Sequence, residues 1–209
     1  DMSAVISDMD QPLGYAVGNA LEVKEAIATL SGNGPEDLRE LVLVLTSLMV
    51  VKAGKAKDIR EARILLEETL DSGKALQVMK EWIVAQGGTA EEVEHPDLLP
   101  QALCQEAVCA EKSGFVTKIH TEEIGRICML LGGGRAKKGD PIDLSVGLVL
   151  QKKVGDPVHS GESLAILHAN DREKLAEAKE RLLKAYEIKK EPVAARPLIW
   201  KILDGTEAE

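Results

Sequence analysis

Residues 4–30 have the sequence AVISDMDQPLGYAVGNALEVKEAIATL, and this stretch decides the fold class. The β-branched run at residues 4–7 predicts a buried strand of the kind found in parallel sheets. Residues 8–14 are dense in turn formers. Asn19, with Glu22 three positions later, predicts the N-cap and capping box of a helix with one apolar face. A strand, a turn and an amphipathic helix in succession predict an α/β protein.

Three more helices are predicted downstream, with glycines between them. The first spans residues 35–53, with proline at its first turn and acidic residues just after it, as helix starts prefer. Its middle is apolar nearly all round, which predicts a buried central helix. The other two are expected at residues 58–70 and 74–86.

The sequence pattern changes near Pro96, where short β-like runs separated by glycine-rich turns begin. Helices at 122–131 and 171–186 interrupt and follow these runs, and residues 192–203 contain a run that could add an edge strand. The predicted strands are residues 104–110, 115–119, 146–151 and 163–168.

The 209-residue chain carries a formal net charge of -9. This charge argues against binding to nucleic acid or to an anionic membrane surface, both of which need clustered basic residues. The longest apolar run, residues 41–51, is too short to span a bilayer, which takes about 20 residues. We expect neither a nucleic-acid nor a membrane partner.

Three cysteines, Cys104, Cys109 and Cys128, form no zinc-type spacing, and their odd number leaves at least one unpaired within the chain. We expect buried thiols of a cytoplasmic protein. The chain begins at Asp1 without an initiator Met and enters a strand within a few residues, so we expect it to be a piece of a longer protein.

Three ordered blocks of this sequence resemble thymidine and pyrimidine-nucleoside phosphorylases. The first is SDMDQPLGYAVGNALEV at residues 7–23. The second is GGGR at 132–135, followed by Ile-Asp and Val-Gly pairs. The third is Val-Gly-Asp at 154–156, leading to Gly-Glu and then LAILH at 164–168. The likeness covers essentially all 209 residues.

The resemblance implies a fold and a division into segments. Residues 1–111 would be the carboxyl-terminal portion of the phosphorylase mixed-sheet α/β domain. Residues 112–188 would be a β-rich, barrel-sandwich-like carboxyl-terminal module, and residues 189–209 a tail. Residues 154–162 are also similar to a turn of biotinyl and lipoyl carrier domains, but no carrier lysine triplet is present, so we predict the architecture without the carrier function.

The resemblance also implies an activity, the cleavage of uridine or thymidine by inorganic phosphate to the free base and a pentose 1-phosphate, in pyrimidine salvage. The family's Lys-His-Ser-Thr-Gly-Gly phosphate loop and its Ser-x-x-x-Lys base-binding segment are not found here. We therefore assign no catalytic and no cofactor-binding residue to this chain. The partners implied are the nucleoside, phosphate, the remaining amino-terminal half of the enzyme, and a second copy in a homodimer.

The resemblance implies one binding site in this chain, for a potassium ion beside the phosphate loop. Its ligands here would be the backbone carbonyls of Leu13 and Ala16 and the carboxylate of Glu25, which are oxygen donors of the type that hard cations prefer. The alternative is that Glu25 is a solvated carboxylate in a charged helix patch.

Other motifs have local explanations. The glycines at 132–134 either form the C-cap of the preceding helix or belong to a loop that closes over the substrate cleft. The aspartates at 140, 143 and 156 are expected to hold their own turns. The four histidines (His95, His120, His159 and His168) are predicted to be structural or surface residues.

Two rival functions remain open from the sequence. A chain without a catalytic constellation could be a non-catalytic structural or binding module. An anthranilate-type phosphoribosyltransferase would share the general fold, but the module at residues 155–168 is not expected in those enzymes.

Overall fold

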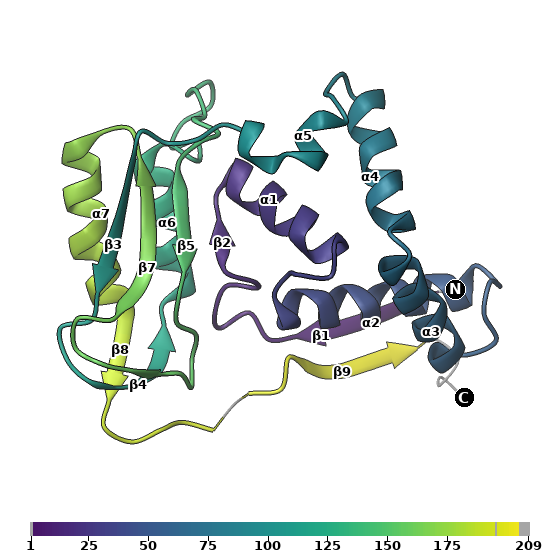
Figure 1. Ribbon diagram of the computed structural model, residues 1–209. Helices are drawn as coiled ribbons and strands as arrows, with labels where there is room; N and C mark the ends of the chain where they lie inside the picture. Colours follow the sequence, from purple (N-terminus) through teal and green to yellow (C-terminus); the bar gives the residue numbers. More distant parts are fainter. Residues whose placement is uncertain (1, 195, 205–209) are drawn as a thin grey trace. The chain divides into compact units, whose positions relative to one another are not determined.

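The computed structural model describes residues 2–194 and 196–204. These residues pack into two compact units, each of which combines separated segments of the chain (Figure 1). Unit 1 takes the described residues of Asp1–Asp8, Ala26–Pro96 and Arg196–Glu209, and unit 2 takes those of Met9–Glu25 and Asp97–Ala195.

Unit 1 is mainly helical and includes a two-stranded sheet. Its elements are β1 (Ser3–Ser7), the last residues of α1 (Asn19–Leu30), α2 (Glu36–Lys52), α3 (Ile59–Asp71), α4 (Lys74–Ala85), α5 (Glu91–Glu94) and β9 (Ile199–Asp204). The strand predicted in the tail is therefore present as β9.

The surroundings of β1 differ from the prediction. The strand pairs antiparallel with β9, with Val5 opposite Ile202. Side chains alternate between partly buried and exposed along β1, and Ile6 is 49% exposed. The prediction of a buried parallel strand is wrong for the described residues, because a β-branched run does not specify which strand will pair with it.

The helices of unit 1 begin where their sequence signals predict. Pro35 precedes α2, and Asp58 caps α3 by accepting a hydrogen bond from the backbone N–H of Glu61 at 2.8 Å. Arg63 joins the two helices through a bidentate ion pair with Glu40, in which its two terminal nitrogens donate to the two carboxylate oxygens at 2.8 and 2.6 Å.

The expectation that α2 is a buried central helix is wrong for the described residues. Leu43 is 2% exposed and Leu48 is 7% exposed, but Met49 is 69% exposed. The apolar helix therefore buries only part of its circumference within the described residues.

Unit 2 combines two antiparallel sheets with two helices. One sheet has the strand order β2-β5-β7-β3 and the other has the order β6-β4-β8. The elements are β2 (Ala16–Val17), the start of α1, η1 (Pro96–Leu98) at its boundary, β3 (Cys104–Cys109), β4 (Gly114–Ile119), α6 (Thr121–Leu131), β5 (Gly147–Leu150), β6 (Pro157–Val158), β7 (Ser163–Ala169), α7 (Arg172–Ala185) and β8 (Tyr186–Lys189).

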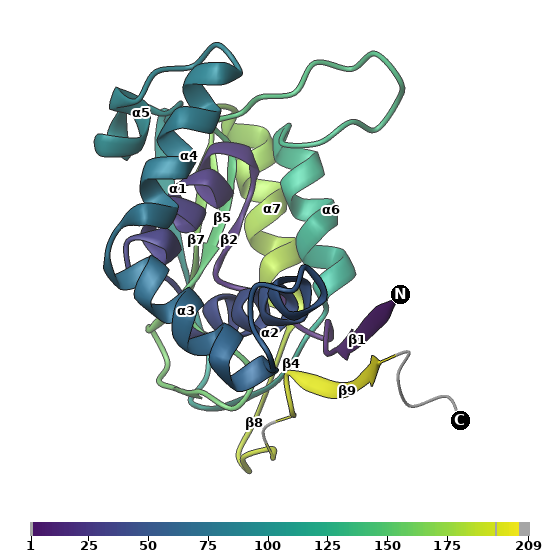
Figure 2. The same ribbon diagram turned by 90° about the vertical axis from the view of Figure 1, so that its right-hand side faces the viewer.

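The main core of unit 2 lies between its sheets and helices α6 and α7, which lie side by side (Figure 2). Each fully buried aliphatic side chain contributes about 1.5–3 kcal/mol, so this core accounts for much of the unit's stability. Its fully buried members include Val108, Val116, Ile124, Ile127, Val146, Leu148, Leu164, Leu167 and Leu182.

The α/β fold class is confirmed, with helices and several sheets. Every strand pair formed by the described residues is antiparallel, and these strands form no closed barrel. The two units are defined by which residues pack together, so their limits differ from the segment limits predicted at residues 111 and 188. Those segment limits stay predictions.

Candidate functional site

The turn formed by residues 11–16, called the 11–16 turn below, lies in unit 2 with the start of α1. The Glu25 carboxylate reaches back from α1 to this turn. Its Oε1 accepts hydrogen bonds from the backbone N–H groups of Tyr15 at 2.8 Å and Ala16 at 3.0 Å. Glu25 is therefore tied to the turn that contains the other predicted ligands, Leu13 and Ala16, and is more than a solvated helix carboxylate.

Gly14 makes this close approach possible. Its φ of 65° lies in the left-handed region, and a Cβ atom there would lie 2.2 Å from Glu25 Oε2. Only a residue without a side chain allows both the backbone conformation and the position of the carboxylate.

The orientation of Ala16 follows from strand pairing. The N–H of Leu150 donates to the carbonyl of Tyr15 at 2.8 Å, and Ala16 lies opposite Val149 in the β2–β5 pair. Hydrogen-bonded and non-hydrogen-bonded pairs alternate in an antiparallel ladder. The backbone groups of Ala16 therefore point away from β5, toward the side where its N–H meets Glu25.

Lys153 binds the same turn from the β5–β6 connection. Its Nζ donates to the carbonyl of Pro12 and, at 2.6 Å, to the carbonyl of Gly14. The ammonium also lies 5.3 Å from the centre of the Tyr15 ring, within the range of a cation–π interaction. None of these contacts uses the carbonyl of Leu13 or Ala16.

A further bond joins the same two segments. The backbone N–H of Val154 donates to Gln11 Oε1 at 2.9 Å. Glu25 thus binds N–H groups of the 11–16 turn, while Lys153 and Leu150 bind its carbonyls.

The chemistry of this turn fits a monovalent cation. Hard cations take carbonyl and carboxylate oxygens, and here a carboxylate is packed against a turn of backbone carbonyls. Within the described residues, no group of three or more His, Cys, Asp and Glu side chains could hold a metal ion. The donor set at the turn therefore differs from the side-chain clusters that bind transition metals.

The glycine loop, residues 132–141, follows α6. Gly132 has φ 112° and ends the helix, and the N–H of Gly133 donates to the carbonyl of Cys128 at 2.9 Å. This is a Schellman-type ending, so the C-cap interpretation of these glycines is confirmed.

Asn19 was expected to cap α1 and does not. Its side-chain amide donates to the carbonyl of Gly133 at 2.9 Å. Glu22 instead accepts from the N–H of Gly18, which precedes the helix. Glu22 therefore binds a backbone N–H at the helix start, as its spacing predicts, but the residue that it binds is Gly18, one position earlier than expected. The Asn19 side chain binds a carbonyl 114 positions away instead.

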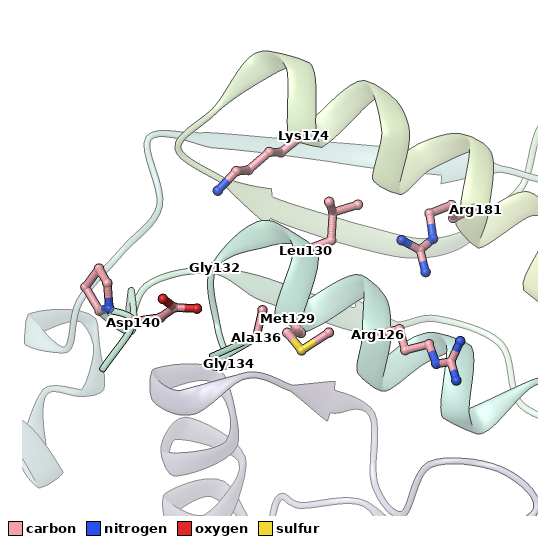
Figure 3. A pocket seen from close by; sticks show the side chains of 10 residues that line it. Arg126, Met129, Leu130, Gly132, Gly134, Ala136, Asp140, Lys174 and Arg181 are labelled. Atoms are coloured by element: carbon pink, nitrogen blue, oxygen red, sulfur yellow. The ribbon is translucent and has the colours of Figure 1, made fainter. Parts of the chain in front are cut away.

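A pocket of about 790 Å³ lies beside the glycine loop, between α6 and α7 (Figure 3). Arg126 and Arg181 line it, and both bind glutamates: Arg126 pairs with Glu122, and Arg181 pairs with Glu123 at 2.6 Å. The Arg181 guanidinium lowers the pKa of Glu123. These pairs link helix residues, so we assign the two arginines a structural role.

Comparison with protein families gives two matches. Residues 2–76 match the a/b domain of the glycosyl transferase family, and residues 115–189 match the pyrimidine nucleoside phosphorylase C-terminal domain. The chain is 51% identical over 197 residues to the pyrimidine-nucleoside phosphorylase of Geobacillus stearothermophilus, covering 94% of this chain and 45% of that protein.

The chain belongs to the pyrimidine-nucleoside phosphorylase family. The enzyme of that name from Bacillus subtilis strain 168 is 58% identical over 167 residues, which is 80% of this chain and 39% of the relative. A Staphylococcus aureus relative (strain N315) is 55% identical over the same length and the same shares. The chain spans less than half the length of these curated relatives.

The remaining candidates in this family member have local structural roles. Asp140, Asp143 and Asp156 each accept a hydrogen bond from a backbone N–H two or three residues away in their own turns, as predicted. His120 pairs with Glu187 at 3.1 Å. His168 is half-buried in β7, where desolvation lowers its pKa.

The expectation of buried thiols holds for Cys128 alone. Burial raises the pKa of its thiol to about 11. Cys104 is partly buried and Cys109 is exposed, because β3 alternates its side chains between two faces.

Lys153 is the residue that sequence reasoning missed. It stands directly before the Val154-Gly155-Asp156 block, so its neighbours were noticed. Its partners lie about 140 positions earlier, and no local spacing signals such a contact.

Among the described residues, no helix is long and apolar enough to cross a membrane.

Proposed function

We propose that this chain is the carboxyl-terminal part of a pyrimidine-nucleoside phosphorylase, which cleaves uridine or thymidine with inorganic phosphate to the free base and a pentose 1-phosphate. The observation that carries the proposal is the match of 80–94% of the chain to enzymes of that name at 51–58% identity. The match at residues 115–189 favours a phosphorylase over a phosphoribosyltransferase that shares the general fold.

The two parts of the enzyme would have different roles in this reaction. Phosphate attack at an anomeric carbon needs N–H groups and cations around the phosphate, and donors that stabilise charge on the leaving base. We assign those groups to the amino-terminal half of the enzyme, which would be this chain's partner. This chain would supply scaffold and a wall of the substrate cleft.

The potassium site is the direct contribution that we propose for this chain. Leu13 and Ala16 would offer carbonyl oxygens and Glu25 a carboxylate oxygen, while the phosphate loop would complete the coordination. The contacts of Glu25 with Tyr15 and Ala16 support the proposal, because they hold the carboxylate against the turn. The ion would fix the shape of the phosphate loop without reacting. We further propose a cytoplasmic homodimer.

The test compares two proteins: the 209-residue chain and the full-length protein that contains it. Each is assayed for phosphorolysis of uridine and thymidine in potassium phosphate, with release of free base as the readout. We expect activity only in the full-length protein. Activity of the 209-residue chain by itself would contradict this division of labour, and inactivity of both would contradict the proposed reaction.

A further inference from the structure

Lys153 binds the 11–16 turn through two carbonyls at alternate positions. Its ammonium group accounts for the carbonyls of Pro12 and Gly14, and Leu150 accounts for that of Tyr15. Three of the carbonyls in this short stretch are thus fixed by the β5 strand and the connection that follows it. Fixing them determines which way the intervening peptide units face.

The peptide units between these anchors include the two predicted cation ligands. The Leu13 carbonyl lies between the two carbonyls that Lys153 holds. Ala16 follows Tyr15, and its backbone faces Glu25. A change in the Lys153 contacts would therefore rotate the peptide units that carry the proposed ligands.

We propose that Lys153 is a positioning residue for the cation site, whose ammonium group holds the 11–16 turn in the shape that presents the Leu13 and Ala16 carbonyls and the Glu25 carboxylate to a monovalent cation. The inference rests on the proposed function. It assigns to the carboxyl-terminal module a role in the affinity of a cation whose proposed ligands all lie outside that module.

The sign of the effect separates positioning from simple electrostatics. Lys153 carries a positive charge near the turn, and like charges repel. If charge were its main influence, removing it would strengthen cation binding. A positioning role predicts the opposite, because groups that orient ligands typically contribute about 10- to 100-fold to metal affinity.

Lys152 provides a matched control. It is the adjacent lysine, but its Nζ pairs with Glu162 and donates to the carbonyl of Pro157 at 3.0 Å. Lys152→Met and Lys153→Met remove the same charge from neighbouring positions, and only the second removes contacts with the 11–16 turn. Lys153→Arg keeps a cationic donor.

The experiment uses the full-length protein and titrates potassium against sodium at constant ionic strength. The readout is the rise in Tm that potassium produces, because a ligand that binds only the folded state stabilises it by RT ln(1 + [L]/Kd), which grows as the affinity grows. The potassium concentration that gives half-maximal phosphorolysis is measured in parallel.

We expect Lys153→Met to raise about tenfold both the potassium concentration that gives a set rise in Tm and the one that gives half-maximal phosphorolysis. Lys152→Met should leave both concentrations unchanged, and Lys153→Arg should restore most of the affinity. An unchanged or tighter potassium response in Lys153→Met would overturn the inference while the phosphorolysis assay still supports the function. A wild-type protein that performs phosphorolysis without any potassium response would overturn the inference as well. Absence of phosphorolysis would instead refute the proposed function.

Discussion

The 11–16 turn and the glycine loop are both rich in turn formers, but they are held in different ways. The first is fixed by Lys153 and Leu150, which are distant in sequence, and by the carboxylate of Glu25 in the helix that follows it. In the glycine loop, Asn19 binds the carbonyl of Gly133 at the helix end, and farther along Asp140 binds the N–H of Lys137, only three residues away. A turn that is fixed by distant parts of the fold can present ligands in a defined geometry, whereas local bonds mainly end a helix and reverse the chain.

The largest expected effect comes from Glu25→Ala. This change removes the proposed cation ligand and leaves the N–H groups of Tyr15 and Ala16 without this acceptor. Loss of the acceptor for the partly buried N–H of Ala16 costs about 1–3 kcal/mol of stability. We expect the potassium-dependent rise in Tm to disappear and the Tm in sodium to fall, as measured by thermal unfolding of the full-length protein.

The control is Glu25→Gln, which keeps an acceptor oxygen and removes the charge. It should retain most of the Tm in sodium while losing most of the potassium response. If Glu25→Ala responds to potassium like the wild type, the carboxylate is not a ligand.

The next largest effect is expected from replacing a glycine in the 11–16 turn, compared with a glycine in the glycine loop. Gly14 and Gly139 both have positive φ angles, of 65° and 98°, so alanine is strained at either position. A Cβ at Gly14 would also lie 2.2 Å from Glu25 Oε2, whereas a Cβ at Gly139 meets nothing within 4 Å. We expect Gly14→Ala to cost about 1–3 kcal/mol more than Gly139→Ala in denaturant unfolding, since overpacking adds to the strain.

Equal destabilisation by the two alanines would show that backbone strain dominates and that the carboxylate moves aside freely. In that case Glu25 would not be held against the 11–16 turn as described.

These results also show what the sequence could predict. Helix starts at Pro35 and Asp58 and the helix end at Gly132 depend on residues within one turn, and they were predicted correctly. The strands β2, β6 and β8 have two to four residues each and exist through pairing with distant strands, so no local pattern revealed them.

The same distinction applies to the candidate site. Glu25 was named through the family resemblance, and its bonds to the turn are seen only in the structure. Lys153 was missed, and the capping role expected of Asn19 was wrong, because in both cases the partner lies more than a hundred positions away. Side-chain chemistry shows what these residues can bind, and the tertiary fold decides what they do bind.

A smaller effect concerns Cys128, at the base of the glycine loop. Burial raises the pKa of its thiol to about 11, above the value of about 8.5 expected in an unfolded chain. A raised pKa favours the neutral thiol in the folded state, so this contribution to stability is present below about pH 8.5 and is lost as the pH rises through about 11. Denaturant unfolding between pH 8 and 11 should therefore show a steeper loss of stability in the wild type than in Cys128→Ala. Equal slopes would mean that the folded thiol ionises as freely as the unfolded one.

The smallest effect is expected from Asp140→Ala in the glycine loop. The carboxylate accepts one hydrogen bond, from the N–H of Lys137 at 2.8 Å, at an exposed position. We expect a loss of about 0.5–1 kcal/mol in denaturant unfolding, with no change in the potassium response. A weakened potassium response in this variant would show that the two regions are coupled.

The most direct test is the rate of uridine phosphorolysis by the full-length protein in potassium phosphate and in sodium phosphate at equal ionic strength. The account predicts phosphorolysis in both salts, with a distinctly higher rate in potassium. Equal rates would contradict a cation site built on Leu13, Ala16 and Glu25, and no release of uracil in either salt would contradict the proposed phosphorylase.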